Sequence, residues 1–370
     1  MIKRLRVRNF KSLLDTAADL EKLTVLIGPT GAGKSNFVSA VRVLSLLINQ
    51  ADGLTSFSES GLTVMGPVKY AGSQVQASWE IEFTEPNSNR EYIYRLTVEI
   101  DENRAIKRIA SEELTADGEV VFKWENNKWL TLHLENQIPG INGSRSMFAA
   151  LANKLREVGR PFELISGEIR CYRIADDVFT QNQSRTGEYR GKMDYSGFGA
   201  LTLVPGVQTN ELVPQIWDKI AEAMKCVTPN AAAIEELFES EFHFGRGGSP
   251  ANNRAIPLGE WSEGFRRLLA TLIAIYQNPP KMTICLDTPE LGLSYRAQMV
   301  LADHLLSANI KLGVQFIITT QSPLFLDRFP PESIRLVEIG DDGTHVKSPS
   351  EDDFIALRDK LMTSGELLTM

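Results

Sequence analysis

Three short apolar runs predict the central strands of the fold. They cover residues 23–27, 281–287 and 314–320. Runs of this kind are typical of parallel strands that are buried on both faces. Helical spacing follows the first two runs, over 36–48 and 295–307, so strand and helix alternate. The stretch from 281 to 320 therefore predicts a parallel crossover unit of strand, helix and strand.

The pattern changes to a period of two residues between positions 75 and 133. Turn signals such as Asp117-Gly118 and Asn126-Asn127 separate the alternating segments. The expected antiparallel strands cover 76–83, 92–100, 113–114 with 119–124, and 128–133. The first ten residues alternate apolar and basic side chains, which predicts an edge strand with one buried face. Helices are expected at 147–158 and 212–224, and loops at 50–74, 181–200 and 245–259.

Composition narrows the function only slightly. The 370 residues carry a net charge of −8, and 43% of them are hydrophobic. This negative charge argues against a protein whose whole surface binds nucleic acid, but it is compatible with a local basic patch. The basic run at 3–8 is interpreted as the solvated surface of a strand. Three scattered cysteines indicate neither a disulfide framework nor a zinc site. Because no signal peptide and no apolar run of membrane-spanning length is found, a cytoplasmic protein without a membrane partner is expected.

The strongest chemical signal is residues 28–35, which fit the pattern G-x-x-x-x-G-K-[ST] between a predicted strand and a predicted helix. Glycines let the backbone fold round a phosphate with its N–H groups pointing inward, and the helix N-terminus adds partial positive charge. Lys34 can reach the β- and γ-phosphates, and Ser35 offers its hydroxyl to Mg²⁺. The expected nucleotide-binding residues are Gly28, Pro29, Thr30, Gly31, Ala32, Gly33, Lys34, Ser35 and Asn36.

An acidic residue ends the second apolar run. Asp287 is followed by Thr288, Pro289 and Glu290. A carboxylate at the C-terminal end of such a strand would lie beside the phosphate loop, where it can hold Mg²⁺ directly or through water. Taken alone this pattern is common, but together with the phosphate loop it predicts a metal site formed by Ser35 and Asp287.

These motifs resemble the ABC-type ATPase heads of the RecF, SMC and OLD group, often called AAA-family ATPases. The resemblance rests on Arg8 to Ser12 with the phosphate loop, and on the stretch from Trp261 to Phe329. It implies an α/β fold, a P-loop NTPase head of the ABC type with a mostly parallel core sheet flanked by helices and an antiparallel β subdomain. A single head over 1–370 is expected, with a phosphate-loop part (1–50), an antiparallel β part (75–135), a helical and loop insert (140–255), a signature and Walker B part (256–330) and a C-terminal tail (331–370).

The resemblance also implies a site that two chains complete. Ser262-Glu263-Gly264 is similar to the signature loop, in which Ser262 and Gly264 would contact the γ-phosphate bound by the opposing subunit. Leu291-Gly292-Leu293 is similar to the D-loop that crosses such a dimer. ATP and Mg²⁺ are therefore the implied cofactors, and a homodimer or higher oligomer formed through the ATP sites is the implied assembly.

Two positions depart from the family pattern. Relatives usually carry a glutamate at the position of Thr288, which polarises the attacking water, and a histidine at the position of Gln321, which senses the γ-phosphate. A missing general base removes about 10²–10⁴ of rate, and threonine cannot accept a proton at neutral pH. The expectation is slow or absent hydrolysis with retained ATP binding. The alternative is that Glu290 substitutes as the base, so the catalytic candidates are Thr288, Glu290 and Gln321.

The expected function is an ATP-gated, dimerising head that controls a partner effector or DNA in anti-phage defence. Relatives of the OLD type carry a C-terminal nuclease domain, and the residues after Phe329 are too few for one, so the effector, a nuclease or a toxin, is expected to be a separate protein. The alternative is an active DNA-dependent ATPase in DNA repair or chromosome maintenance. A transporter subunit fits less well with Asn9-Phe10-Lys11, and a kinase would leave the Ser262 element unexplained.

Overall fold

The computed structural model describes residues 1–49, 75–85, 88, 90–101, 106–131, 146–152, 156–176, 178, 193, 195, 197, 216–227, 243–245, 255–257, 261–277 and 280–358. The loop expected at 50–74 lies outside the described residues, and so does most of those expected at 181–200 and 245–259. At the start of the last of these and within it, β10 (His243–Gly245) and β11 (Ala255–Pro257) form a short antiparallel pair.

The core is a six-stranded, mostly parallel sheet, as the sequence predicts. Its strand order is β15-β14-β3-β13-β12-β9, and β15 is the antiparallel strand at one edge. The strands are β3 (Leu23–Ile27), β9 (Ile169–Tyr172), β12 (Thr283–Asp287), β13 (Gln315–Thr319), β14 (Ile334–Gly340) and β15 (Gly343–Lys347). β3, β12 and β13 are buried at every position, which explains why these stretches are apolar without alternation. Residues 334–347 of the expected tail thus belong to the core sheet.

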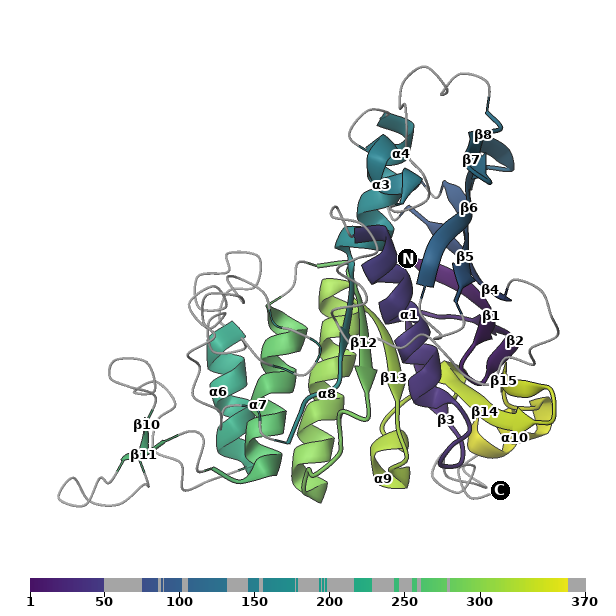
Figure 1. Ribbon diagram of the computed structural model, residues 1–370. Helices are drawn as coiled ribbons and strands as arrows, with labels where there is room; N and C mark the ends of the chain where they lie inside the picture. Colours follow the sequence, from purple (N-terminus) through teal and green to yellow (C-terminus); the bar gives the residue numbers. More distant parts are fainter. Residues whose placement is uncertain are drawn as a thin grey trace.

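Helices cover both faces of this sheet (Figure 1). One face packs against α6 (Ile216–Val227), α7 (Glu263–Tyr276), α8 (Tyr295–Leu312) and α9 (Pro323–Leu326). The other face packs against α1 (Lys34–Asn49). Successive residues of β12 alternate between the two faces: Ile284 and Leu286 point toward α7 and α8, and Cys285 points toward α1. The chain also forms a 3-10 turn at Pro331–Ser333 and α10 (Glu351–Arg358).

A second, antiparallel sheet of seven strands lies on the far side of α1. Its strand order is β2-β1-β4-β5-β6-β7-β8. The strands are β1 (Ile2–Phe10), β2 (Leu13–Asp19), β4 (Val75–Thr84), β5 (Glu91–Ile100), β6 (Ile106–Ala116), β7 (Glu119–Glu125) and β8 (Lys128–Trp129). β6 is longer than the expected strand at 113–114, and the last expected strand, 128–133, is described only as the two-residue β8.

The prediction that the first ten residues form an edge strand is wrong. β1 pairs with β2 on one side and with β4 on the other. Alternation reports one buried face, and it carries no information about how many neighbours a strand has. The basic side chains of β1 point outward, and Arg6 forms a 2.7 Å ion pair with Asp15 of β2. This pairing supports the interpretation of the basic run as solvated strand surface.

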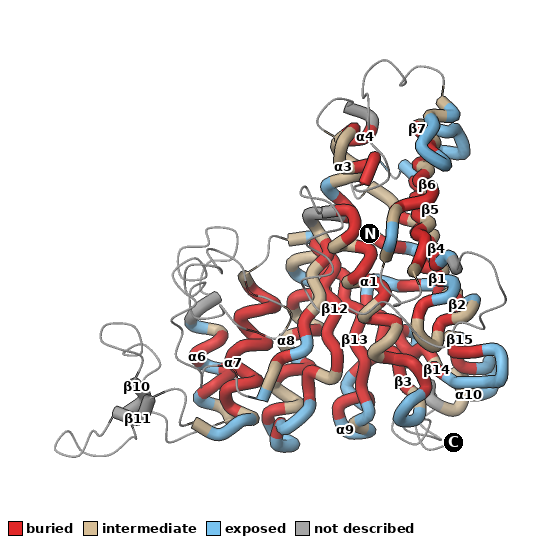
Figure 2. Tube along the Cα trace, viewed as in Figure 1, coloured by how far each residue is buried: buried red, intermediate tan, exposed pale blue. Residues whose placement is uncertain are grey.

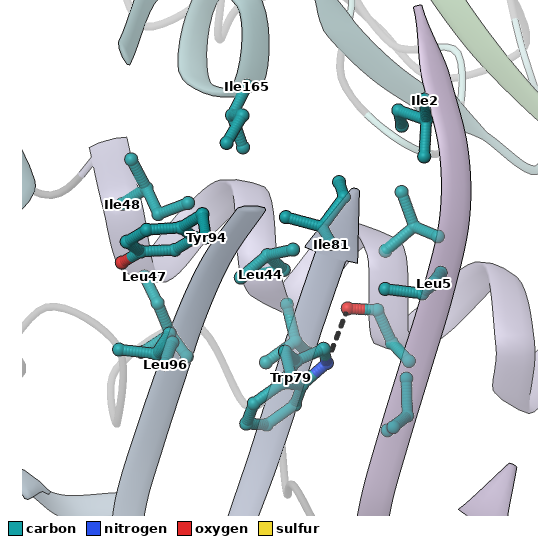
Figure 3. Close-up of a cluster of buried hydrophobic side chains, with 14 of the residues drawn as sticks. Ile2, Leu5, Leu44, Leu47, Ile48, Trp79, Ile81, Tyr94, Leu96 and Ile165 are labelled. Atoms are coloured by element: carbon teal, nitrogen blue, oxygen red, sulfur yellow. Dashed lines mark hydrogen bonds between the residues drawn. The ribbon is translucent and has the colours of Figure 1, made fainter. Parts of the chain in front are cut away.

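α1 is packed between the two sheets and is buried along most of its length (Figure 2). Figure 3 shows Leu44, Leu47 and Ile48 of α1 against residues of β1, β4 and β5. The indole N–H of Trp79 in β4 donates a 3.1 Å hydrogen bond to the carbonyl of Ala40 in α1. Because α1 begins at the phosphate loop, burial on both sides fixes the position of that loop.

The helix expected at 147–158 is described as two helices, α3 (Met147–Ala152) and α4 (Arg156–Phe162), followed by a π-helical turn at Glu163–Gly167. The first N–H groups of α3 bond to Glu112, a buried acidic residue of β6 in the antiparallel sheet. The carboxylate of Glu112 accepts hydrogen bonds from the hydroxyls of Tyr94 (2.6 Å) and Ser146 (2.7 Å) and from the backbone N–H groups of Met147 and Phe148. Burial raises the pKa of Glu112, and these four donors oppose the shift.

Replacing Glu112 by leucine should therefore destabilise the protein strongly. Four buried donors would lose their acceptor, and we expect a loss of about 3–5 kcal/mol in the free energy of unfolding. Glu112→Gln, which keeps an acceptor oxygen, should cost less. Urea denaturation followed by circular dichroism measures both, with Glu119→Gln at an exposed position of β7 as the control. Equal stability of Glu112→Leu and the control would contradict this account.

Candidate functional site

The phosphate loop joins the end of β3 to the start of α1. Gly28 has φ +148°, and a Cβ added there would lie 2.0 Å from the carbonyl oxygen of Val337 in β14. Only glycine fits so close to a neighbouring strand. The loop is further supported by Thr344 of β15, whose hydroxyl donates to the carbonyl of Ala32 (2.8 Å). The strands from the end of the chain thus shape the loop near its beginning.

The side chain of Asn36 also supports the loop. Its Nδ2 donates a 2.8 Å hydrogen bond to the hydroxyl of Ser12, which also shares a 2.8 Å hydrogen bond with the hydroxyl of Thr344. Ser12 lies in the turn between β1 and β2. This contact connects the Asn-Phe-Lys-Ser segment between β1 and β2 with the start of α1, although Ser12 and Asn36 are 24 positions apart in the sequence.

Lys34 is buried, and its ammonium group lies over the loop. Nζ donates to the carbonyl oxygens of Gly28 (2.6 Å) and Pro29 (2.8 Å). Burial lowers the pKa of Lys34, and the negative charges of Asp287 and Glu290 raise it in part. A flexible cation held by carbonyl oxygens at this position can transfer its hydrogen bonds to phosphate oxygens.

Asp287 ends β12 opposite the loop, as the sequence predicts. Its Oδ1 accepts hydrogen bonds from the hydroxyls of Ser35 (2.9 Å) and Thr319 (2.7 Å). Its Oδ2 is buried and has no hydrogen-bond partner. A buried carboxylate oxygen without a donor is costly unless a cation compensates it. An oxygen-binding cation such as Mg²⁺ therefore fits the pair formed by Ser35 and Asp287.

Thr288 has an unusual backbone conformation. Its φ is +50°, which for a β-branched residue costs about 1–3 kcal/mol. Its N–H donates to the hydroxyl of Thr319 (2.9 Å), and its own hydroxyl donates to the carbonyl of Asp287 (2.8 Å). The Thr288 side chain is therefore held against its own strand, and its hydroxyl proton is already engaged.

Glu290 connects this turn with the end of β13. Its Oε1 accepts hydrogen bonds from the hydroxyl of Thr320 (2.7 Å) and the N–H of Gln321 (3.1 Å), and its Oε2 is buried without a hydrogen-bond partner. Burial raises the pKa of Glu290. The amide oxygen of Gln321 accepts a 3.2 Å hydrogen bond from Thr30 of the phosphate loop. The three catalytic candidates from the sequence thus lie next to one another at the same end of the sheet.

Several charged residues of this region were not identified from the sequence as site residues. Lys11 lies in the β1–β2 turn, and burial lowers its pKa together with the nearby charge of Arg42, while Asp287 opposes the shift. Arg42 of α1 stacks on the ring of Tyr195 at 4.0 Å. Burial, followed by the charge of Asp287, raises the pKa of Tyr195 to about 12. These residues belong to separate segments, and no local spacing connects them.

The expected signature and D-loop segments pack against each other. Ser262 caps the start of α7, and its hydroxyl accepts a 3.4 Å hydrogen bond from the N–H of Phe265. A Cβ on Gly264 would lie 2.5 Å from the carbonyl oxygen of Gly292, so only glycine fits there. Leu291 is exposed beside them. The structure therefore brings these two segments to one place on the surface, directly after the strand that ends in Asp287.

Two buried arginines of α7 hold the segment that follows β9. Arg266 donates to the carbonyl of Val178 (2.9 Å), and Arg267 donates to the carbonyl of Ile174 (2.9 Å) and pairs with Asp176. The signature segment is thus connected to the edge of the core sheet that carries β9.

Comparisons with known proteins agree with this geometry. A model of the family described as "AAA ATPase domain" matches residues 1–145, and a model described as "AAA domain, putative AbiEii toxin, Type IV TA system" matches residues 218–327. An OLD nuclease of Thermus scotoductus (strain ATCC 700910 / SA-01) is 25% identical over 389 residues. The alignment covers 96% of this chain but only 66% of the nuclease.

Two solved structures share the fold. An SMC head bound to the C-winged helix domain of ScpA gives a TM-score of 0.55 at 15% identity and covers 95% of this chain and 99% of that chain. An SMC head with an extended coiled coil, bound to the C-terminal domain of ScpA and derived from Pyrococcus furiosus, gives a TM-score of 0.54 at 13% identity and covers 97% and 99%.

The fold and the phosphate loop define a P-loop NTPase head of the ABC type. The two family matches and the OLD relative support an ATPase head that is similar to those of the RecF, SMC and OLD group, and with it an ATP-binding head. Among the described residues no cluster of three or more His, Cys, Asp or Glu side chains is placed to hold a metal. None of the helices in the described part of the chain is long and apolar enough to cross a membrane.

Proposed function

We propose that this head uses bound ATP to self-associate, hydrolyses it slowly or not at all, and thereby controls a partner effector or DNA. The observation that carries this proposal is the geometry of Thr288. At the position where relatives carry a glutamate base, the side chain has no carboxylate, and its hydroxyl donates to the carbonyl of Asp287. Nothing on this side chain can accept a proton from water at neutral pH.

Binding does not depend on that missing base. Lys34 and the loop N–H groups would bind the triphosphate, and Ser35 and Asp287 would hold Mg²⁺. When bound, Mg²⁺ would supply positive charge to the β- and γ-phosphates. The Oδ2 of Asp287, which is buried and has no hydrogen-bond partner, supports a cation at this place. A site that keeps these groups and lacks the base should retain ATP rather than turn it over.

Self-association is supported by the arrangement of α7 and the segment at 291–293. Ser262 caps the start of a long buried helix, and the N-terminus of a helix is suited to an anion. Gly264 and Gly292 approach closely, and Leu291 projects from them as an exposed apolar side chain. A second head that presents its bound γ-phosphate here would cover this surface and complete its own site with Ser262 and Gly264.

Replacing Ser262 by arginine should therefore block ATP-driven association without weakening ATP binding by a single chain. The larger side chain would obstruct the surface where a neighbour's phosphate would dock. Sedimentation velocity with and without a non-hydrolysable ATP analogue measures the association. Ser350→Arg is the matched control, since Ser350 also bonds to the first turn of a helix, α10, in another part of the fold.

An ATP-dependent increase in mass is expected for the wild-type chain and for the control only. The dissociation constant of ATP, measured by calorimetry at low protein concentration, should be the same for all three chains. If the Ser262→Arg chain associates like the wild type, the assignment of this surface to the dimer is wrong.

The identity of the partner is the broadest part of the proposal. One family description names a putative toxin of a toxin–antitoxin system, and the OLD relative is a nuclease. These names support an effector as the partner, and the nuclease supports one that acts on nucleic acid. The role in anti-phage defence is proposed from the resemblance of the motifs. Copurification with and without the ATP analogue identifies an effector, and binding of duplex DNA in the same two conditions tests whether DNA itself is the partner.

Glu290 supports a second candidate function, an active DNA-dependent ATPase. The Oε2 of Glu290 is buried without a hydrogen-bond partner, and burial raises the pKa of the carboxyl group, which makes its carboxylate a stronger base. The two candidates are distinguished by steady-state phosphate release with and without DNA. Multiple turnovers stimulated by DNA would favour the second candidate, in repair or chromosome maintenance.

A further inference from the structure

Arg173 lies beside Asp287 at the edge of the phosphate site. β9 and β12 are parallel neighbours with Tyr172 opposite Leu286, so the next residues, Arg173 after β9 and Asp287 at the end of β12, lie side by side. The Nη1 of Arg173 is 3.8 Å from the Oδ2 of Asp287, the buried oxygen that has no hydrogen bond. The guanidinium of Arg173 thus places a positive charge near an oxygen that accepts no hydrogen bond.

The two partners differ in their freedom to move. The side chain of Asp287 is 1% exposed, while that of Arg173 is 56% exposed. The backbone of Arg173 is held, because its N–H donates a 2.7 Å hydrogen bond to the carbonyl of Tyr195. The guanidinium can therefore leave the carboxylate by side-chain rotation, whereas the carboxylate remains fixed by Ser35 and Thr319.

Arginine and Mg²⁺ cannot use this oxygen together. A guanidinium has donors and no lone pair, so it cannot serve as a metal ligand beside Asp287. A cation that approaches Oδ2 would meet the positive charge of Arg173 within a few ångströms, and two such charges repel. Other positive charges lie in this region, since Lys11 interacts with Asp287 and with Arg42, and both Arg42 and Arg173 act on the nearby Tyr195.

We propose that Arg173 is a displaceable counter-ion of Asp287, which neutralises the carboxylate before a divalent cation binds and is released to the phosphates of the nucleotide when the cation arrives. This inference rests on the proposed ATP and Mg²⁺ site. It makes Arg173 a positioning residue with two opposite effects. It supports binding of metal-free ATP through its positive charge, and it raises the concentration of Mg²⁺ needed to fill the site.

The test compares the full chain with its Arg173→Gln and Arg173→Lys variants. Arg90→Gln is the control, since Arg90 is a comparably exposed arginine that pairs with Asp117 on the antiparallel sheet. ATP affinity is measured by calorimetry in EDTA. The temperature of half-unfolding is measured at saturating ATP over a series of MgCl₂ concentrations. The Mg²⁺ requirement is the concentration that gives half of the full increase in this temperature. Unfolding without ligand confirms that each variant is folded.

In EDTA, Arg173→Gln should bind ATP about fivefold to tenfold more weakly than the wild type, because one nearby positive charge is lost. At saturating ATP the same variant should need about fivefold less Mg²⁺ for half of the full stabilisation. Arg173→Lys should lie close to the wild type in both measurements, and Arg90→Gln should change neither.

An unchanged or higher Mg²⁺ requirement in Arg173→Gln would overturn the inference while the wild type still binds ATP. If the wild-type chain binds ATP neither in EDTA nor with Mg²⁺, the proposed function itself is wrong. The two failures are therefore distinguishable by the wild-type measurement alone.

Discussion

Replacing Lys34 by alanine should lower the affinity for ATP by about 100-fold or more, because the main mobile positive charge over the phosphate loop is lost. The fold should remain intact. The Lys34 ammonium bonds to the carbonyl oxygens of Gly28 and Pro29 and fills no apolar core, so its removal leaves the packing of α1 unchanged. Calorimetric titration with Mg²⁺ and ATP measures the effect.

The control is Lys347→Ala. Lys347 is an exposed lysine of β15 whose ion pair with Glu338 (2.8 Å) lies on the same six-stranded sheet. Its replacement should leave ATP affinity and thermal stability close to the wild-type values. Unchanged ATP affinity in the Lys34→Ala chain would show that this loop is not the nucleotide site, whatever its sequence.

Replacing Thr288 by glutamate should raise ATP turnover by about 10²-fold or more, since a general base contributes about 10²–10⁴ in rate. In the proposed site Asp287, Ser35 and Lys34 would hold the metal and the phosphates, so the added carboxylate would complete it. The unbranched glutamate should also tolerate φ +50° better than threonine does. Phosphate release in the steady state measures the rate.

Thr288→Gln separates the two effects. Glutamine has the shape of glutamate and relieves the same backbone strain, but it cannot accept a proton, so its turnover should remain at the wild-type level. Adding Gln321→His to Thr288→Glu should raise the rate further, and by more than the single changes predict, because both groups would face one γ-phosphate.

A native rate of about 1 s⁻¹ or faster, as in ordinary enzymes, would contradict the weakened site. Glu290 would then be the first residue to test. Glu290→Gln keeps an oxygen to accept the hydrogen bonds from Thr320 and Gln321, and it should stop the reaction if Glu290 is the base.

The sequence by itself determined the class of fold and the centre of the site. Short apolar runs that do not alternate with polar residues are typical of strands covered on both faces, and their alternation with helices indicates that these strands are parallel. Parallel strands end at the same edge of a sheet. For that reason Asp287, which is 252 positions from Ser35, could be expected beside the phosphate loop, and the structure places their oxygens 2.9 Å apart.

The tertiary structure alone decided which other groups meet at that edge. The position of β1 inside its sheet, the packing of β14 against Gly28 and the proximity of Arg173 to Asp287 depend on strand order. Local periodicity does not encode strand order, because it reports which face of an element is buried and not which element covers it. The same holds for Thr288, whose positive φ accompanies hydrogen bonds from its N–H to Thr319 on the neighbouring strand.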